Sequence, residues 1–263
     1  MKHWKKNRKR VWCDSMEVLF RSLRDGIANG KGILRQMLYP ARCPVCDRPV
    51  KPAGGNICYE CHKKIRIIQE PRCMKCGKEL KEQSQELCRD CMTKTHRYVR
   101  GAALFEYDCI QESLYRFKYE GREEYTGFYS QEMVRYLGDM IREIEPDALV
   151  PVPIHPERMQ KRGYNQAKLL ADGIGKRMGI PVRDQIVVRC RNTIPQKNLA
   201  PNERQNNLKR AFKIYENDVK LKTIIIVDDI YTTGSTIDAL CEVLEKSGVE
   251  RIYYVTLAIG KGV

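Results

Sequence analysis

Two adjacent carboxylates, Asp228 and Asp229, stand between an apolar run and a loop of hydroxyl side chains in the segment TIIIVDDIYTTGSTI, residues 223–237. The apolar run, 224–227, is β-branched and lacks polar alternation, which predicts a strand buried on both faces, as in a parallel sheet. Apolar residues at helical spacing begin at Ile237. The segment therefore predicts a strand, an acidic pair, a hydroxyl loop and a helix, in that order.

The hydroxyl loop, 232–236, is suited to hold a phosphate. A loop that leads into a helix offers free backbone N–H groups and the positive end of a dipole, and Gly234 allows close approach of the backbone. Asp228 and Asp229 would repel a phosphate, so we expect them to accept hydrogen bonds from vicinal hydroxyls or to act near magnesium. A ligand with a phosphate at one end and a diol in the middle is a ribose 5-phosphate. The alternatives are a strand–turn–helix corner with capping side chains, and an acidic pair like that of a receiver domain.

This segment resembles the phosphoribosyl-pyrophosphate (PRPP) motif of type I phosphoribosyltransferases. The resemblance implies that Asp228 and Asp229, as the catalytic acids, hold the 2′- and 3′-hydroxyls of the ribose. It also implies that the loop cradles the 5-phosphate through Thr232, Thr233, Gly234, Ser235 and Thr236.

The rest of the second half predicts the sheet that must position this motif. Strands are expected at 99–107, 147–152, 186–190 and 251–257, and helices at 110–119, 127–144 and 166–178. Strands that alternate with helices predict an α/β fold: a parallel sheet, here type I phosphoribosyltransferase-like, with helices on both faces. Before it, an amphipathic helical region at 14–38 is expected to pack on its own protein, although it could also bind a membrane or a partner.

A PRPP site makes two further demands on the chain. The pyrophosphate needs a turn after an earlier strand, and VPVPIHPER supplies a candidate with Pro153, Ile154 and His155 at its apex. A flexible loop that closes over the site is expected at 192–209. Its candidate cations, which would neutralise the departing pyrophosphate, are Arg191, Lys197 and Arg204. The alternative is an ordinary solvated loop.

Eight cysteines form two copies of C-x2-C-x11-C-x2-C, thirty residues apart. Each copy supplies four thiolates, a complete ligand set for one structural zinc ion. The repeat favours ligands drawn within each copy, as in two tandem zinc ribbons, over a cross-braced arrangement. The expected ligands are Cys43, Cys46, Cys58 and Cys61 in the first copy, and Cys73, Cys76, Cys88 and Cys91 in the second. His62 and His96 are expected to be surface residues rather than ligands.

The charge of the 263-residue chain is uneven. The whole chain has 48 Lys and Arg against 33 Asp and Glu, a net charge of +15, and residues 1–98 alone carry +13. This excess favours a polyanionic partner, either nucleic acid or an anionic membrane surface, over a solvated basic face. Basic ribbons with Tyr59 and Tyr98 available for stacking suit single-stranded nucleic acid. No apolar run is long enough to span a membrane, and Asp14 and Glu17 interrupt any signal-peptide core.

Several motifs together resemble the ComF family of competence proteins: LYPARCPVC, RFKYEGR, LVPVPIHPERMQKRGYNQA, NTIPQKNL, ER-x-x-N and IIIVDDIYTTGST. The predicted organisation is a basic tail and helix at 1–39, tandem zinc ribbons at 40–97 and a phosphoribosyltransferase-like domain at 98–263. The resemblance implies a cytoplasmic protein that binds PRPP with Mg²⁺, two zinc ions and single-stranded DNA, and that acts with the DNA-uptake machinery in natural transformation. The alternative is an active phosphoribosyltransferase with a structural zinc hood.

Overall fold

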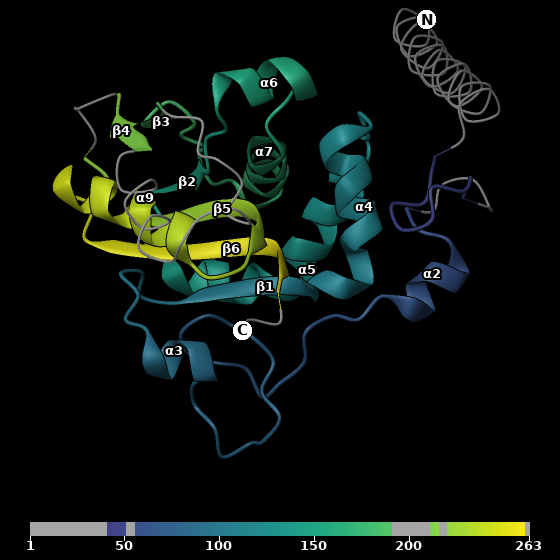
Figure 1. Cartoon of the computed structure of the whole chain (residues 1–263), viewed down its shortest axis with the longest axis horizontal. Helices are drawn as coiled ribbons and strands as arrows, with labels where there is room; N and C mark the ends of the chain where they lie inside the picture. The colour runs from purple at the N-terminus through teal and green to yellow at the C-terminus, as the bar shows by residue number, and fades with distance from the viewer. Residues whose placement is uncertain (1–40, 51–55, 191–210, 216–219, 261–263) are drawn as a thin grey trace, which may run out of the picture. The chain divides into compact units, whose positions relative to one another are not determined.

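The computed structural model describes residues 41–50, 56–190, 211–215 and 220–260 (Figure 1). These fall into two compact units, one with residues 41–43, 48–50 and 56–58, the other with 44–47 and the described residues from 59 onward. In the first unit, the amide of Cys43 donates to the carbonyl of Arg48 at 2.8 Å, which closes a tight turn. The helical region expected at 14–38, the loop expected at 192–209, and the candidate cations Arg191, Lys197 and Arg204 lie outside the described residues.

The second unit is built on a four-stranded parallel sheet, as predicted, with the order β1-β6-β5-β2. Its strands are β1 (Gly101–Glu106), β2 (Ala148–Pro151), β5 (Thr223–Tyr231) and β6 (Arg251–Ile259). The β-branched run of β5 occupies the centre, where Ile226 aligns with Tyr254 on one side and with Val150 on the other. All four residues from Ile224 to Val227 are fully buried, which explains why this strand contains no polar alternation.

Helices cover both faces of the sheet (Figure 1). The described helices around it are α4 (Tyr107–Tyr119), α5 (Tyr125–Ile144), α7 (Gln166–Met178) and α9 (Ser235–Lys246). Alternate residues of β5 point to opposite faces, and Ile224 and Ile226 share a hydrophobic cluster with Leu240 and Leu244 of α9. On the other side, α4 and α5 contact β1, and α7 contacts β2 and β5.

The second cysteine repeat is part of the same core as the sheet. Cys73, Cys76 and Cys88 belong to the hydrophobic cluster that contains Ile226 and Leu240. The hydroxyl of Tyr254 in β6 donates to the carbonyl of Cys76 at 2.9 Å. Two short helices accompany the repeats, α2 (Tyr59–Lys64) and α3 (Arg89–Thr93). The second ribbon therefore packs directly on the sheet.

Two local predictions need correction. The strand expected at 186–190 is β3 (Val187–Arg189), but it pairs antiparallel with β4 (Phe212–Ile214) in a separate two-stranded sheet. The edge of β2 is already occupied, because Leu149 forms a parallel bridge with Val182 before β3 begins. Strand β5 continues through the acidic pair to Tyr231, so the acids lie within the strand.

The turn expected after β2 contains a short helix, α6 (Pro156–Arg162). Proline at its first position and Gly163 in the left-handed conformation at its end, with φ of 82°, are signals that the sequence carried. None of the helices in the described residues combines the length and the apolar character needed to span a bilayer.

Candidate functional site

A cavity of about 600 Å³ opens at the carboxyl ends of β2 and β5, where ligands of parallel sheets bind. Four of its lining residues come from the second half of β5 and the loop and helix that follow: Asp228, Asp229, Thr232 and Thr236. The other lining residues come from the end of α4, the turn after β2, α6, the start of α7 and β3. They are Lys118, Tyr119, Val152, Pro153, Ile154, Arg158, Lys161, Arg162, Asn165, Gln166, Ala167 and Arg189, together with Ile230 of β5.

The acidic pair is held in place by the strand and by one lysine. The backbone amide of Asp229 donates to a carboxylate oxygen of Asp228 at 2.8 Å. The ammonium of Lys118, at the end of α4, forms an ion pair with the Asp229 carboxylate. Burial alone would lower the pKa of Lys118, but the charges of Asp229 and Asp228 raise it above its ordinary value. The pKa of Asp228 is raised well above its ordinary value, because the group is enclosed and lies next to the charge of Asp229.

Four more cations line the cavity. Arg158, Lys161 and Arg162 come from α6, and Arg189 comes from β3. Burial and the neighbouring charges of Arg158 and Arg162 lower the pKa of Arg189. Such a concentration of positive charge around two carboxylates fits a ligand that has several phosphate oxygens and also presents hydroxyl donors.

The turn after β2 is anchored by Asn165, the residue that caps α7. Its side-chain amide donates to the carbonyl of Val152 at 3.0 Å, and its side-chain oxygen accepts from the amide of Ala167 at 3.1 Å. Pro153 and Ile154, two of the three residues predicted for the pyrophosphate turn, line the cavity. His155 is not among the lining residues, because its ring caps α6 by accepting from the amide of Glu157 at 3.3 Å.

The hydroxyl loop meets the cavity through Thr232 and Thr236. The hydroxyls of Thr233 and Ser235 instead bond each other at 2.9 Å. Gly234 has φ of 74°, and a Cβ added to it would lie 2.5 Å from the hydroxyl of Tyr231. Packing behind the loop therefore demands a glycine here, in addition to any need for close approach to a phosphate.

A segment that follows the second ribbon supports the back of this loop. The ammonium of Lys94 donates to the carbonyl of Thr233 at 2.8 Å. The ring of His96 lies 2.8 Å from the carboxylate of Asp238 in α9, and it stacks on Tyr98 with 5.0 Å between centroids. The expectation of a surface position for His96 is wrong, since it is 5% exposed. The expectation that Tyr98 is available for stacking on nucleic acid is also wrong, because its ring is fully buried.

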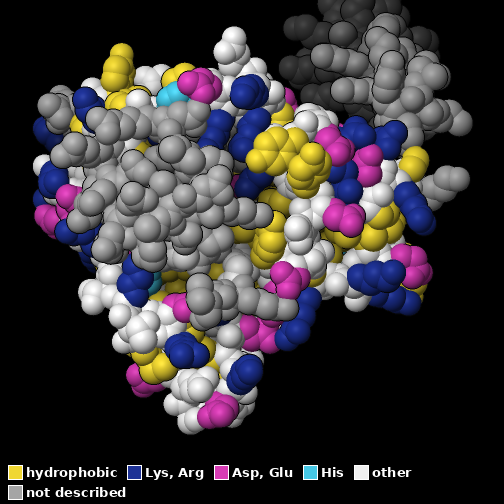
Figure 2. All heavy atoms as spheres, in the orientation of Figure 1, with side chains coloured by type: hydrophobic (Ala, Val, Ile, Leu, Met, Phe, Trp, Pro, Cys, Tyr) yellow, Lys and Arg dark blue, Asp and Glu magenta, His cyan; other side chains and the backbone are white. Residues whose placement is uncertain are grey.

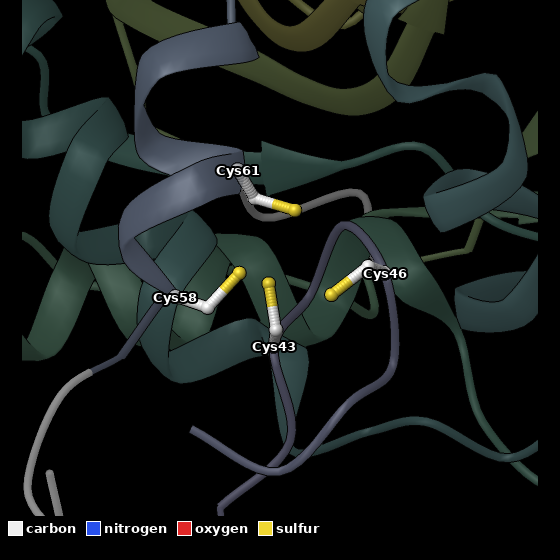
Figure 3. Close-up of side chains that lie close together, drawn as sticks. All are labelled: Cys43, Cys46, Cys58 and Cys61. Atoms are coloured by element: carbon white, nitrogen blue, oxygen red, sulfur yellow. The ribbon is translucent and has the colours of Figure 1, made fainter. Parts of the chain in front are cut away.

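The cysteines form two separate sets, each drawn from one repeat, so the cross-braced alternative is wrong. In Figure 3 the sulfurs of Cys43, Cys46, Cys58 and Cys61 point towards a common centre. Within each set the four sulfurs lie within 4.8 Å of one another. Tetrahedral zinc with bonds of about 2.3 Å places its sulfurs about 3.8 Å apart, and the sulfurs of Cys76 and Cys88 are separated by 3.6 Å. The donor chemistry and spacing of both sets thus fit structural zinc.

Sequence reasoning missed the cationic side of the cavity. Lys118 lies within the motif RFKYEGR, and the three cations of α6 lie within LVPVPIHPERMQKRGYNQA. Both motifs supported the family resemblance, but the sequence assigned no role to these basic side chains. Arg189 had no motif to mark it. Their common position appears only when α4, α6 and β3 converge on the end of β5.

Comparisons with known proteins agree with this architecture. Residues 34–92 match the double zinc ribbon domain, and residues 160–262 match the phosphoribosyl transferase domain. The chain is 39% identical to Competence protein F of Haemophilus influenzae over 115 residues, which are 43% of this chain and half the length of that relative.

Two other relatives are similar over most of the chain. DNA utilization protein YhgH of Escherichia coli K12 is 27% identical over 81% of this chain and 94% of its own length. Competence protein ComFC of Bacillus subtilis is 28% identical over 78% of each chain. The double zinc ribbon, the phosphoribosyltransferase domain and these relatives together support the resemblance of the chain to the ComF family.

Proposed function

We propose that the cavity at the end of β5 binds PRPP together with Mg²⁺. The observation that carries this proposal is that the acidic pair, Thr232 and Thr236 line the same cavity as five cations. Asp228 and Asp229 would accept hydrogen bonds from the ribose hydroxyls, and the start of α9 would hold the 5-phosphate. The basic residues of α6 and Arg189 would hold the pyrophosphate beside the turn at Pro153.

Calorimetry with PRPP and Mg²⁺ tests this assignment. Asp229→Asn removes charge-assisted hydrogen bonds, so we expect PRPP binding to weaken by about 2 kcal/mol or more. A matched control is Asp172→Asn on α7, because Asp172 is an exposed acid paired with Lys168 and does not line the cavity. Unchanged PRPP affinity in D229N, or an equal loss in D172N, would contradict the proposed site.

We further propose that the protein binds single-stranded DNA and acts in DNA uptake during natural transformation. The support is the net charge of +13 on residues 1–98 and the similarity to proteins named for competence and DNA utilization. Filter binding to oligonucleotides at several salt concentrations tests for the contacts to phosphates, since such contacts release counterions. A C58S/C61S variant that kept full affinity would rule out the first ribbon as a contributor to binding.

A second candidate function is catalysis of phosphoribosyl transfer, favoured by the acidic pair and the basic pyrophosphate side in one cavity. In that reaction the bond from C1 of the ribose to pyrophosphate breaks, and a nucleophile with an N–H group forms the new bond to C1 and loses its proton. Pyrophosphate release measured with candidate amines and bases tests this function. Release no faster than in D228N/D229N, with every acceptor tried, would count against it and leave PRPP as a bound ligand.

A further inference from the structure

Two tyrosines of α4, Tyr115 and Tyr119, form an exposed aromatic pair one helical turn apart. Tyr115 is 57% exposed and Tyr119 is 59% exposed, and the centroids of their rings are 5.1 Å apart. The guanidinium of Arg162 lies over the Tyr119 ring, 4.8 Å from its centroid, and also donates to its hydroxyl at 3.1 Å. Figure 2 shows hydrophobic side chains over α4 next to a group of basic side chains near α6.

The pair makes no evident contribution to the core of the protein. The opposite face of α4 buries Ile110, Leu114 and Phe117, and these residues anchor the helix. Other tyrosines in this region, such as Tyr125 and Tyr129, are almost completely buried. Large aromatic rings that are exposed together beside a charged cavity point to a binding surface.

The surface continues into the cavity. Both Tyr119 and Arg162 line it, and Arg158 and Lys161 lie in the same wall. Aromatic rings stack on the faces of nucleobases, and neighbouring cations neutralise the phosphates. Base faces are accessible in a single strand and hidden within a duplex, so this combination fits single-stranded nucleic acid.

The ribbons offer much less stacking surface. Among residues 41–97, Tyr59 is the only Phe, Trp or Tyr in the sequence, and Tyr98, which follows, is fully buried. The ammonium of Lys63 lies 4.0 Å from the centroid of the Tyr59 ring. The ribbons therefore supply positive charge, whereas the paired rings lie on α4.

We propose that Tyr115 and Tyr119, with Arg162, form a stacking site for the bases of single-stranded DNA at the mouth of the PRPP cavity. This inference rests on the proposed function, because it assigns the bases of the bound strand to a place on the phosphoribosyltransferase domain. The strand would extend from the tyrosine pair towards the basic residues of α6.

Fluorescence anisotropy with labelled oligo-dT, compared with a strand of the same length made of abasic sites, tests the proposal. Y115A/Y119A should bind oligo-dT at least about tenfold more weakly. This change corresponds to the loss of the stacking interaction of roughly one base. Its affinity for the abasic strand should stay near that of the unsubstituted protein, because both keep the same cations. Y115F/Y119F keeps both rings and should retain most of the preference for oligo-dT.

Two exposed tyrosines serve as matched controls. Tyr136 on α5 is 41% exposed, carries the guanidinium of Arg135 at 5.3 Å from its centroid, and does not line the cavity. Tyr59 tests the ribbon in the same way. We expect Y136A and Y59A to keep the affinity for oligo-dT, and thermal unfolding to show that all variants fold.

The outcomes separate this inference from the function on which it rests. Unchanged oligo-dT affinity in Y115A/Y119A would overturn the stacking site and leave DNA binding intact. An equal loss for the abasic strand would also overturn it, because the effect would then not involve bases. If the unsubstituted protein failed to bind oligo-dT, the DNA part of the proposed function would fail together with the stacking site, while PRPP binding would be judged separately by calorimetry.

Discussion

The ammonium of Lys118 forms an ion pair with the carboxylate of Asp229 inside the cavity, and the two side chains are only 20% and 11% exposed. Lys118 lies in the last turn of α4 and Asp229 lies in β5, so the pair joins two elements that converge on the site. It also neutralises one charge of the acidic pair. This contact fixes the position of the Asp229 carboxylate at the end of α4.

Loss of Lys118 should therefore destabilise the protein. Lys118→Met leaves two adjacent, poorly hydrated carboxylates without their cation, and we expect the free energy of unfolding to fall by about 3 kcal/mol at neutral pH. Urea denaturation measures this change. Lys246→Met is the control, since its pair with Glu242 is exposed and should contribute less than about 0.5 kcal/mol.

A double-mutant cycle isolates the interaction itself. In a D229N background the same Lys118→Met substitution should cost much less, because the carboxylate that it leaves unpaired is gone. Equal costs in both backgrounds would show that Lys118 stabilises the fold in some other way.

The raised pKa of Asp228 predicts that PRPP binding depends on pH. Ribose hydroxyls donate to the ionised carboxylate, so affinity should fall as the pH is lowered through a value above the ordinary Asp pKa of about 3.9. At pH values below the folded-state pKa of Asp228, binding should also release a proton from this carboxyl, which calorimetry detects by comparing buffers with different enthalpies of ionisation. The phosphates of PRPP titrate as well, so D228N provides the reference. Identical pH profiles for D228N and the unsubstituted protein would contradict the prediction.

The same pKa predicts a stability effect with the opposite pH dependence. A pKa of Asp228 that is higher in the folded than in the unfolded state means that the fold disfavours the charged carboxyl. The contribution of this group to the stability of the fold is therefore present at low pH and is lost as the pH rises through the folded-state pKa. Asp228→Asn should therefore increase the free energy of unfolding at neutral pH while weakening PRPP binding. Denaturation curves at pH 5 and pH 8 measure this; a destabilised D228N at the higher pH would refute it.

The two zinc sites should differ in their effect on the cavity proposed to bind PRPP. Cys73, Cys76 and Cys88 share a core with the sheet, and the ammonium of Lys94, just after the second ribbon, donates to the carbonyl of Thr233 in the hydroxyl loop. We expect C88S/C91S to lower the free energy of unfolding by more than about 3 kcal/mol and to weaken PRPP binding, because metal binding contributes directly to folding.

The first ribbon provides the matched control for that experiment. C58S/C61S removes the corresponding second pair of cysteines from the first ribbon. The thiols of this pair are not in the core cluster shared with the sheet. Near-ultraviolet circular dichroism of the buried tyrosines and PRPP calorimetry should change much less in this variant. Equal losses in the two variants would show that the second ribbon has no special connection to the cavity.

A glycine beneath the second ribbon should not tolerate a side chain. A Cβ added to Gly101 in β1 would lie 1.9 Å from the ring of Tyr254. Gly101→Ala should therefore lower the free energy of unfolding by about 2 kcal/mol or more, because the ring must leave its position against Cys76. Gly127→Ala in α5 meets no atom within 4 Å and should be neutral or slightly stabilising. Thermal unfolding of both variants checks the contrast.

The sequence by itself determined the local elements with strong periodicity or distinctive chemistry. The β-branched run of β5 predicted a buried strand, and the cysteine repeat favoured two complete ligand sets, each drawn from one copy. The helix predicted at 166–178 is α7 with the same bounds, since Asn165 and Gly179 supply signals at its two ends. Such features depend on neighbours along the chain, which the sequence displays directly.

Only the tertiary structure decided which distant side chains meet. Nothing in the periodicity around Lys118 indicates that it will face Asp229, and nothing beside Tyr98 shows that its ring is covered by Tyr254. Burial of His96 likewise depends on α9, more than a hundred residues further along the chain. Hydrophobic spacing specifies the inward face of an element but not its packing partner. The cations of the cavity and the contacts that support the hydroxyl loop are therefore visible only in the folded arrangement.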